Sequence, residues 1–188
     1  MNKVKFGLEN VHIAPITAVA NGSYTYGEVF KIPGAVNLTL DPEGEETNFF
    51  ADNIKYFNEM ANQGYTGSLE MALLTDEFRE KVLNEVKDSN GGFIEDASRS
   101  PIGFALGFQI LGDKANRRFW YYNVSASRPA NNASTTETSK TPQTDTVNIT
   151  ASPRLTDKRV KYMLEKTDEN AAVYNSFFNA VYESTISA

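Results

Sequence analysis

An alternation of apolar and polar residues in the last third of the chain constrains the fold most strongly. Between Thr146 and Ser152, the residues Val147, Ile149 and Ala151 take every second position, and polar residues take the positions between them. This period of two is typical of a strand with one face in the core and the other in solvent. The pattern therefore predicts a strand here and a sheet-based fold around it.

The segment from Arg117 to Pro129 is aromatic and also has the composition of a strand. Its alternation gives two apolar faces, with Trp120, Tyr122 and Val124 on one and Phe119 and Tyr121 on the other. A strand that is apolar on both faces is expected to be covered on both, by its own core or, on one face, by another subunit. The pair Arg117-Arg118 could start a basic, aromatic nucleic-acid patch. The alternative, favoured by the acidic chain, is the charged end of a strand that enters the core.

Further strands are expected along most of the chain. The pattern predicts them at residues 4–13, 29–40, 65–74, 103–111 and 159–164, with Leu69, Met71 and Leu73 of the third facing inward. Residues 41–46 read as an acidic turn, and residues 47–60 as a hairpin centred on Asp52-Asn53. A helix at residues 54–60 is the alternative to the second arm of this hairpin.

Two helices are predicted where the apolar period changes to that of a helix. The first begins at Thr75 or Asp76, and the second is capped by Asp168. Their apolar residues are Phe78, Val82, Leu83 and Val86 in the first, and Val173, Tyr174, Phe177, Phe178, Val181 and Tyr182 in the second.

Many strands with two inserted helices and no βαβ alternation predict a mainly β protein, an antiparallel β-sandwich or barrel with one or two flanking helices. We expect a single domain over residues 1–188, with an N-terminal arm at residues 1–28 that is broken at Pro15. The stretch from 129 to 141 is rich in Ser, Thr and Asn, which predicts a long polar loop.

Composition argues against several kinds of chemistry. The chain has one histidine, His12, and no cysteine, so a multi-histidine metal site and a thiolate site are excluded. No nucleotide-binding loop occurs. We therefore expect no enzyme activity, no cofactor and no metal, and His12 reads as an ordinary packing or surface residue. The net charge of −6 argues against a grip on nucleic acid by phosphate neutralisation. The sequence shows no signal peptide or membrane span, which predicts a soluble cytosolic protein.

Several motifs, taken together and in order, resemble the major tail proteins of long-tailed bacteriophages and related prophages. They are Tyr122-Asn-Val-Ser-Ala-Ser-Arg-Pro129, Pro142-Gln-Thr-Asp-Thr-Val-Asn-Ile-Thr-Ala-Ser-Pro-Arg154, Lys5-Phe-Gly-Leu-Glu-Asn-Val-His12, Ile32-Pro-Gly-Ala-Val36, Leu40-Asp-Pro-Glu-Gly44, Phe50-Ala-Asp-Asn53, Gly64-Tyr-Thr-Gly-Ser-Leu-Glu70 and Tyr174-Asn-Ser-Phe-Phe178. They span nearly the whole chain.

The resemblance implies a siphophage tail-tube subunit, a virion protein made in the cytoplasm of the host bacterium. Such subunits form six-fold rings that stack into a conduit for DNA, which passes without specific binding. The implied partners are further copies of the chain and the tail-terminator, tape-measure and baseplate proteins, with no membrane contact. The inner tube of a contractile tail or injection machine is the alternative within this class.

For a tail tube, two groups of residues are candidate sites. The hairpin residues Asp52, Asn53 and Glu59 are expected at the lumen, with an aromatic base packed on the domain, although an ordinary surface turn explains Asp52-Asn53 equally well. The loop residues Asn131, Asn132, Ser134, Thr135 and Thr136 are expected to contact a neighbouring subunit and to become ordered there. A flexible surface loop explains the same composition equally well. From a different class, the alternative is a β-sandwich carbohydrate- or surface-binding module with Trp120, Tyr121 and Tyr122 as its aromatic platform.

Overall fold

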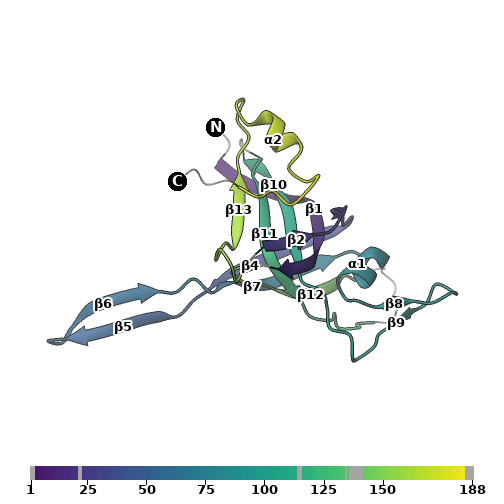
Figure 1. The fold of residues 1–188 in the computed structure, drawn as a ribbon, viewed down its shortest axis with the longest axis horizontal. Coiled ribbons are helices and arrows are strands. Elements are labelled where there is room, and N and C mark those ends of the chain that lie inside the picture. The colour runs from purple at the N-terminus through teal and green to yellow at the C-terminus, as the bar shows by residue number, and fades with distance from the viewer. Residues whose placement is uncertain (1–2, 21–22, 114–115, 134, 136–141, 185–188) are drawn as a thin grey trace.

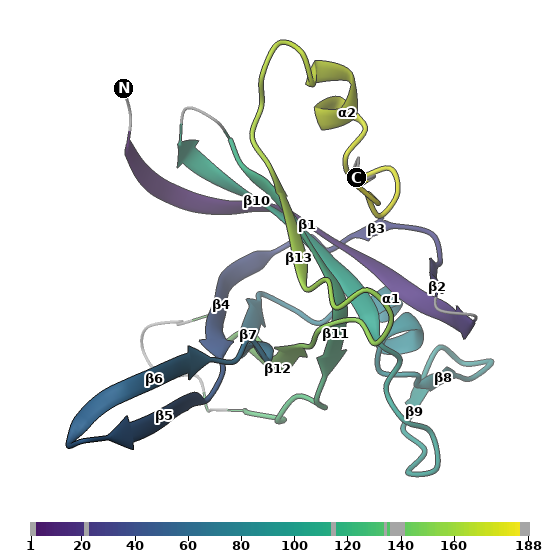
Figure 2. The same ribbon diagram turned by 60° about the vertical axis from the view of Figure 1, so that its left-hand side comes forward.

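The protein is an antiparallel, mainly β structure with a long hairpin that extends from its body (Figures 1 and 2). The computed structural model describes residues 3–20, 23–113, 116–133, 135 and 142–184. Within these residues the helical content is confined to two short helices, α1 (Asp76–Lys81) and α2 (Ala171–Asn175). The predicted mainly β, antiparallel class with two flanking helices is confirmed.

Nine strands form the main sheet. They are β1 (Lys3–Ala20), β2 (Ser23–Tyr26), β3 (Phe30–Lys31), β4 (Ala35–Glu43), β7 (Gly64–Met71), β10 (Phe104–Asp113), β11 (Arg118–Ala126), β12 (Asp145–Ala151) and β13 (Lys161–Leu164). Their order is β2-β1-β10-β11-β12-β7-β4, with β13 beside β11 and β3 beside β1. The first half of β11 pairs with β13 and its second half with β12, so the sheet divides at this strand. The sheet is not closed into a barrel.

Strand β1 pairs with β10 from Lys3 to Pro15 and with β2 from Ile16 to Ala20, and it does not break at Pro15. Proline lacks an N–H group, so a strand can pass through it only where that donor is not needed. The neighbouring groups supply the pairing, because the Ile16 amide donates to the Gly103 carbonyl at 2.7 Å and the Gly27 amide donates to the Pro15 carbonyl at 2.8 Å. Residues 3–20 are therefore paired within the sheet along their length, apart from the register shifts.

Two hydrophobic clusters cover the two faces of β10 and β11. The larger one joins the sheet to α1 and includes Phe104, Leu106, Tyr121 and Phe78. The smaller one includes Trp120, Tyr122 and Phe177, and residues 177–182 cover this face. The prediction that β11 is covered on both faces is confirmed, and the described chain itself supplies both covers.

One face assignment in β11 was wrong. Val124 belongs to the larger cluster with Tyr121, and not to the face of Trp120 and Tyr122. Between the pairs Phe104↔Val124 and Leu106↔Tyr121 the register shifts, which marks a β-bulge. A bulge inserts one extra residue into a strand, so the side chains beyond it change faces.

The first helix begins where the sequence predicts and ends earlier. The Thr75 side chain accepts a hydrogen bond from the Phe78 amide and caps α1, and Phe78, Val82 and Leu83 are buried. Val86 lies instead in β8 (Val86–Lys87), which pairs with β9 (Phe93–Ile94). Leu73, expected inward, is exposed because β7 ends at Met71.

The second helix is much shorter than predicted, and its N-cap is Asn170, not Asp168. Phe177 and Tyr182 follow it in a non-helical segment and still pack on the smaller cluster. Core side chains bind the backbone of this segment: Trp120 Nε1 donates to the Phe177 carbonyl at 3.0 Å, and the Tyr122 hydroxyl donates to the Tyr182 carbonyl at 2.9 Å. These two hydrogen bonds hold residues 177–182 in a non-helical conformation.

Candidate functional site

The hairpin predicted at residues 47–60 is present and stands clear of the body in both views (Figures 1 and 2). It consists of β5 (Glu46–Ala51) and β6 (Ile54–Met60), joined by Asp52 and Asn53. These two residues have φ angles of 52° and 61°. Two successive left-handed residues form the turn that matches the twist of a two-residue hairpin, and Asp and Asn adopt this region more readily than most residues.

The hairpin exposes large apolar side chains along its whole length. The apolar residues that are between 50% and 74% exposed are Phe49, Phe50, Ile54, Tyr56, Phe57 and Met60. Phe49 pairs directly with Phe57, so one cross-strand aromatic pair stands in solvent. The expected packing of the aromatic base on the domain does not occur. A two-stranded hairpin is marginally stable on its own, and exposed apolar patches of this kind mark interaction sites.

Polar contacts along the hairpin hold its two strands in register. Lys55 forms an ion pair with Glu46, and Asn58 Nδ2 donates to Glu46 Oε1 at 2.6 Å. The hydrogen bond from Lys55 lowers the pKa of Glu46, so this carboxylate stays charged. Glu59 lies opposite Thr47 on the exposed strand pair. The predicted candidates Asp52, Asn53 and Glu59 thus share one projecting element.

The second predicted group does not lie on that element. Asn131, Asn132 and Thr135 are exposed and belong to the link between β11 and β12. Ser134 and Thr136 lie outside the described residues. The structure therefore keeps the two candidate groups on separate segments of the chain.

The aromatic platform considered for a carbohydrate-binding module is absent from the surface. Trp120 and Tyr122 are fully buried, and Tyr121 is buried as well. Tyr121 packs edge-on to Tyr65, with ring centroids 5.3 Å apart, and Trp120 packs against Phe178 at 5.8 Å. A sugar cannot stack on rings that already form the core, so these three residues do not form the exposed aromatic platform that such a module needs.

Arg118 likewise serves the fold. Its guanidinium lies 3.9 Å from the centroid of the Tyr174 ring and 5.0 Å from that of Phe178, and its Nε donates to Gln109 at 3.0 Å. A cation held over aromatic rings in this way contributes to packing. Arg117 forms an ion pair with Glu165. The interpretation as the charged end of a strand therefore explains both arginines.

His12 is a packing residue. Its ring stacks on Phe178 with centroids 4.4 Å apart, and its Nδ1 lies 2.7 Å from the Asn10 carbonyl. Burial lowers the pKa of His12, so the ring is neutral at pH 7. Among the described residues, no group of three or more His, Cys, Asp and Glu side chains could hold a metal ion.

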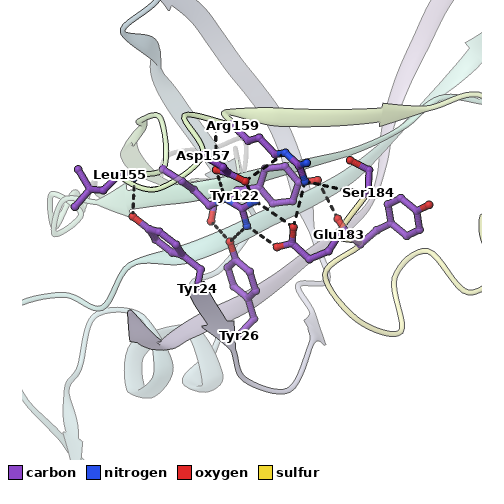
Figure 3. A network of polar contacts seen from close by, with 10 residues as sticks. Tyr24, Tyr26, Tyr122, Leu155, Asp157, Arg159, Glu183 and Ser184 are labelled. Atoms are coloured by element: carbon purple, nitrogen blue, oxygen red, sulfur yellow. Dashed lines mark hydrogen bonds and ion pairs between the residues drawn. The ribbon is translucent and has the colours of Figure 1, made fainter. Parts of the chain in front are cut away.

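A buried charge network that the sequence pattern did not indicate surrounds Arg154 (Figure 3). The Arg154 residue is 4% exposed, and its guanidinium forms ion pairs with Asp157 and Glu183. It also lies 4.4 Å from the centroid of the Tyr122 ring, and its Nη1 is 3.4 Å from the Tyr26 hydroxyl. Burial alone would lower the pKa of Arg154, but the hydrogen bonds to the two carboxylates outweigh it, and the group stays charged. Burial raises the pKa of Tyr26 to about 12, so its hydroxyl stays neutral.

The network fastens the C-terminal segment to the turn that follows β12. Arg159 joins it through Asp157, at 3.3 Å, and through the Ser184 carbonyl, at 2.9 Å. Glu183 and Ser184 come from the far end of the described chain, so their contacts hold that end over the smaller cluster. In the sequence, this network is visible only as an arginine after a proline, Pro153-Arg154, and that pattern is too common to predict a buried cation.

The chain matches no known protein family and no curated protein. In the described residues, neither helix is long and apolar enough to cross a membrane. The features that remain to explain are an open antiparallel sheet and a projecting hairpin with apolar side chains in solvent.

Proposed function

We propose that this protein is the major tail-tube subunit of a long-tailed phage or prophage, and that copies of it assemble into stacked rings around a DNA conduit. The subunit fold would be a β-sandwich or barrel of the tail-tube type, completed by neighbouring subunits. The motif resemblance from Lys5 to Phe178 is the starting point of the proposal. Inner tubes of contractile tails remain the alternative within the class.

The observation that carries the proposal is the exposed β5–β6 hairpin. It presents aromatic side chains in solvent on an element that lies outside the sheet and both hydrophobic clusters. Such a surface is unfavourable for a protein that acts alone, because burial of apolar area is favourable by about 25 cal/mol per Å². A subunit that is permanently assembled buries this apolar area against its neighbours.

The open sheet supports the same proposal. Its strand order ends at β2 on one side and at β4 on the other, and β13 adds a short outer strand beside β11. The outer edge of an end strand carries backbone groups that can pair with a strand of another subunit. Repeated around a ring, such pairing removes the free edges and closes a continuous barrel.

Electron microscopy of the purified protein, with size-exclusion chromatography across a concentration series, tests the proposal. We expect rings or tubes with a central hole. In Phe49→Ser and Tyr56→Ser assembly should fall strongly, while the unassembled protein should keep its melting temperature because both side chains are solvent-exposed. Leu73→Ser is the matched control, since Leu73 is as exposed as the hairpin residues and lies outside the hairpin. A protein that stays monomeric at every concentration would refute the proposal.

The charge of the tube lumen gives a second test. DNA that must slide should meet no cation that holds its phosphates, because each such contact has to be released again. The acidic tip at Asp52 is the candidate lumen element. Asp52→Lys should leave tubes intact and slow DNA ejection from assembled particles, with Asp52→Asn as the milder control. Normal ejection from particles that carry Asp52→Lys would remove this residue from the lumen.

A further inference from the structure

The chain that follows α2 covers one face of the sheet without forming a helix or a strand. This cover consists of residues 177–184, and side-chain contacts attach it to the sheet. Its apolar residues pack on the smaller hydrophobic cluster, and they are Phe177, Phe178, Val181 and Tyr182. Trp120 is fully buried against Phe177 and Phe178, with ring centroids 6.4 Å and 5.8 Å apart. The attachment of the cover therefore decides whether Trp120 meets solvent.

His12 of β1 holds the near end of the cover. The His12 ring stacks on the Phe178 ring, with centroids 4.4 Å apart and an angle of 11° between the ring planes. Its Nδ1 lies 2.7 Å from the Asn10 carbonyl oxygen, which can only accept a hydrogen bond. The neutral ring therefore carries its hydrogen on Nδ1, and β1, the cover and Trp120 are joined through one stack of rings.

Ion pairs hold the far end of the cover (Figure 3). Glu183 pairs with the buried Arg154, and Asp157 pairs with both Arg154 and Arg159. Partial burial acts to raise the pKa of Asp157, but hydrogen bonds from Arg154 and the Arg159 amide lower it by a larger amount, so Asp157 keeps its charge in mild acid. Histidine is the side chain whose charge normally changes between about pH 5 and pH 8. His12, the only histidine in the chain, is therefore the point of attachment that responds to mild acid.

The surroundings of His12 disfavour a charged ring. Burial is the main cause that lowers the pKa of His12, the Asn10 carbonyl opposes it, and the cations Lys31 and Arg118 add to the lowering. Lys31 lies opposite His12 on β3, and the Arg118 guanidinium on β11 lies 5.0 Å from the centroid of the ring on which His12 stacks. Glu9, the one carboxylate of β1, is exposed. A protonated His12 would thus put a second cation on a ring that Arg118 already contacts.

We propose that residues 177–184 form an acid-sensitive lid, which protonation of His12 releases from Trp120 and from the face of β10 and β11 beneath it. The larger cluster, which joins the sheet to α1, includes neither His12 nor the lid, so the body stays folded. Since folding lowers the pKa of His12 from its ordinary 6.5, the lid is fully stable above about pH 6.5 and loses stability as the pH falls toward the folded pKa. A pKa that folding lowers by one unit raises the opening equilibrium constant about tenfold once the ring is protonated.

Trp120 reports the opening directly, because it is the only tryptophan in the chain. Acrylamide quenching of its fluorescence is measured on the unassembled protein between about pH 7.5 and about pH 5, the range in which histidine titrates. Far-UV circular dichroism at each pH follows the sheet. We expect the quenching constant to rise about twofold or more as the pH falls, and to return when the pH is raised, while the circular dichroism stays constant.

Two variants assign the change to His12. His12→Phe keeps a ring that can stack on Phe178 and cannot be protonated, and His12→Gln keeps a donor for the Asn10 carbonyl without a titrating group. In both, the quenching constant should stay the same over this pH range.

A flat quenching constant in the parent protein would overturn the proposal, and so would a rise that persists in either variant. Loss of the circular-dichroism signal together with the rise would overturn it too, because the whole protein would then unfold. A single subunit suffices for this lid, so none of these outcomes bears on tube assembly.

Discussion

Replacement of Arg154 by alanine should be among the most destabilising single changes in this protein. The Arg154 side chain is 5% exposed and forms ion pairs with Asp157 and Glu183, whose side chains are 34% and 45% exposed. Removal of one member of a buried ion pair costs about 3–5 kcal/mol, because the remaining charge is left without a partner. Water can reach both carboxylates here, so we expect the lower end, about 3 kcal/mol.

Arg159→Ala is the matched control. Arg159 shares both carboxylate partners, at 3.3 Å and 3.8 Å, but its side chain is 28% exposed. Ion pairs in contact with solvent contribute about 0–1 kcal/mol, so this change should cost far less. The two arginines share their carboxylate partners and differ in burial and in the contacts of Arg154 with Tyr122 and Tyr26.

Urea unfolding of the unassembled protein measures the free energy of unfolding of both variants, and thermal unfolding measures their melting temperatures. For a protein of this size, each kcal/mol shifts the melting temperature by about 2–4 °C, so Arg154→Ala should melt about 6–12 °C lower. The loss should also appear as faster proteolysis of the C-terminal segment, because Glu183 anchors it. Equal losses of unfolding free energy for Arg154→Ala and Arg159→Ala would refute the reasoning that burial makes the Arg154 ion pairs important for stability. A loss below about 1 kcal/mol for Arg154→Ala would refute it as well.

Three further predictions concern single positions. Thr75→Ala should lower the free energy of unfolding by about 1 kcal/mol, measured by urea unfolding, because it removes the cap of α1, and Thr75→Ser should restore most of it. Gly64→Ala should cost more than about 2 kcal/mol by the same measurement, since a Cβ there would lie 2.0 Å from the Ala151 carbonyl oxygen; Gly91→Ala, with open space around it, should cost about 1 kcal/mol. Asp157→Asn should flatten the acid limb of the stability curve. Partial burial raises the pKa of Asp157, but hydrogen bonds from Arg154 and the Arg159 amide lower it by a larger amount. The folded pKa of Asp157 is therefore below the unfolded value of about 3.9. The stability that Asp157 contributes is therefore present above about pH 5 and lost as the pH falls toward the folded pKa, which thermal melts between acid and neutral pH can follow.

Local patterns predicted those elements whose structure local forces decide. Val147, Ile149 and Ala151 are buried as their alternation predicts, because one face of β12 meets the core. The turn at Asp52-Asn53 is also local: two residues that tolerate left-handed φ angles suffice to form it. The same applies to Thr75, whose side chain caps a helix within three residues of itself.

Features that depend on distant neighbours could not be predicted in this way. The sequence around Pro15 does not tell that its carbonyl meets Gly27 while the next amide meets Gly103. Helical spacing at residues 173–182 is misleading because Trp120 and Tyr122 bind carbonyls of that segment. For the candidate site, the pattern predicts the hairpin but not that Phe49 and Phe57 stand in solvent, since exposure depends on what the rest of the chain leaves uncovered.

The pairing of β1 with distant parts of the chain has a consequence for the order of events during synthesis. Pro15 pairs with Phe104, and Ala14 shares a cluster with Phe177, so β1 finds its partners far along the sequence, in β10 and in the segment after α2. Contacts between residues so far apart in sequence slow folding, because a long loop must close before they form. We expect β1 to remain unpaired until β10 has been synthesised, and the second cluster to form only after the segment that contains Phe177 has also been synthesised. The nascent chain would thus depend on chaperones in the interval between the synthesis of β1 and its pairing.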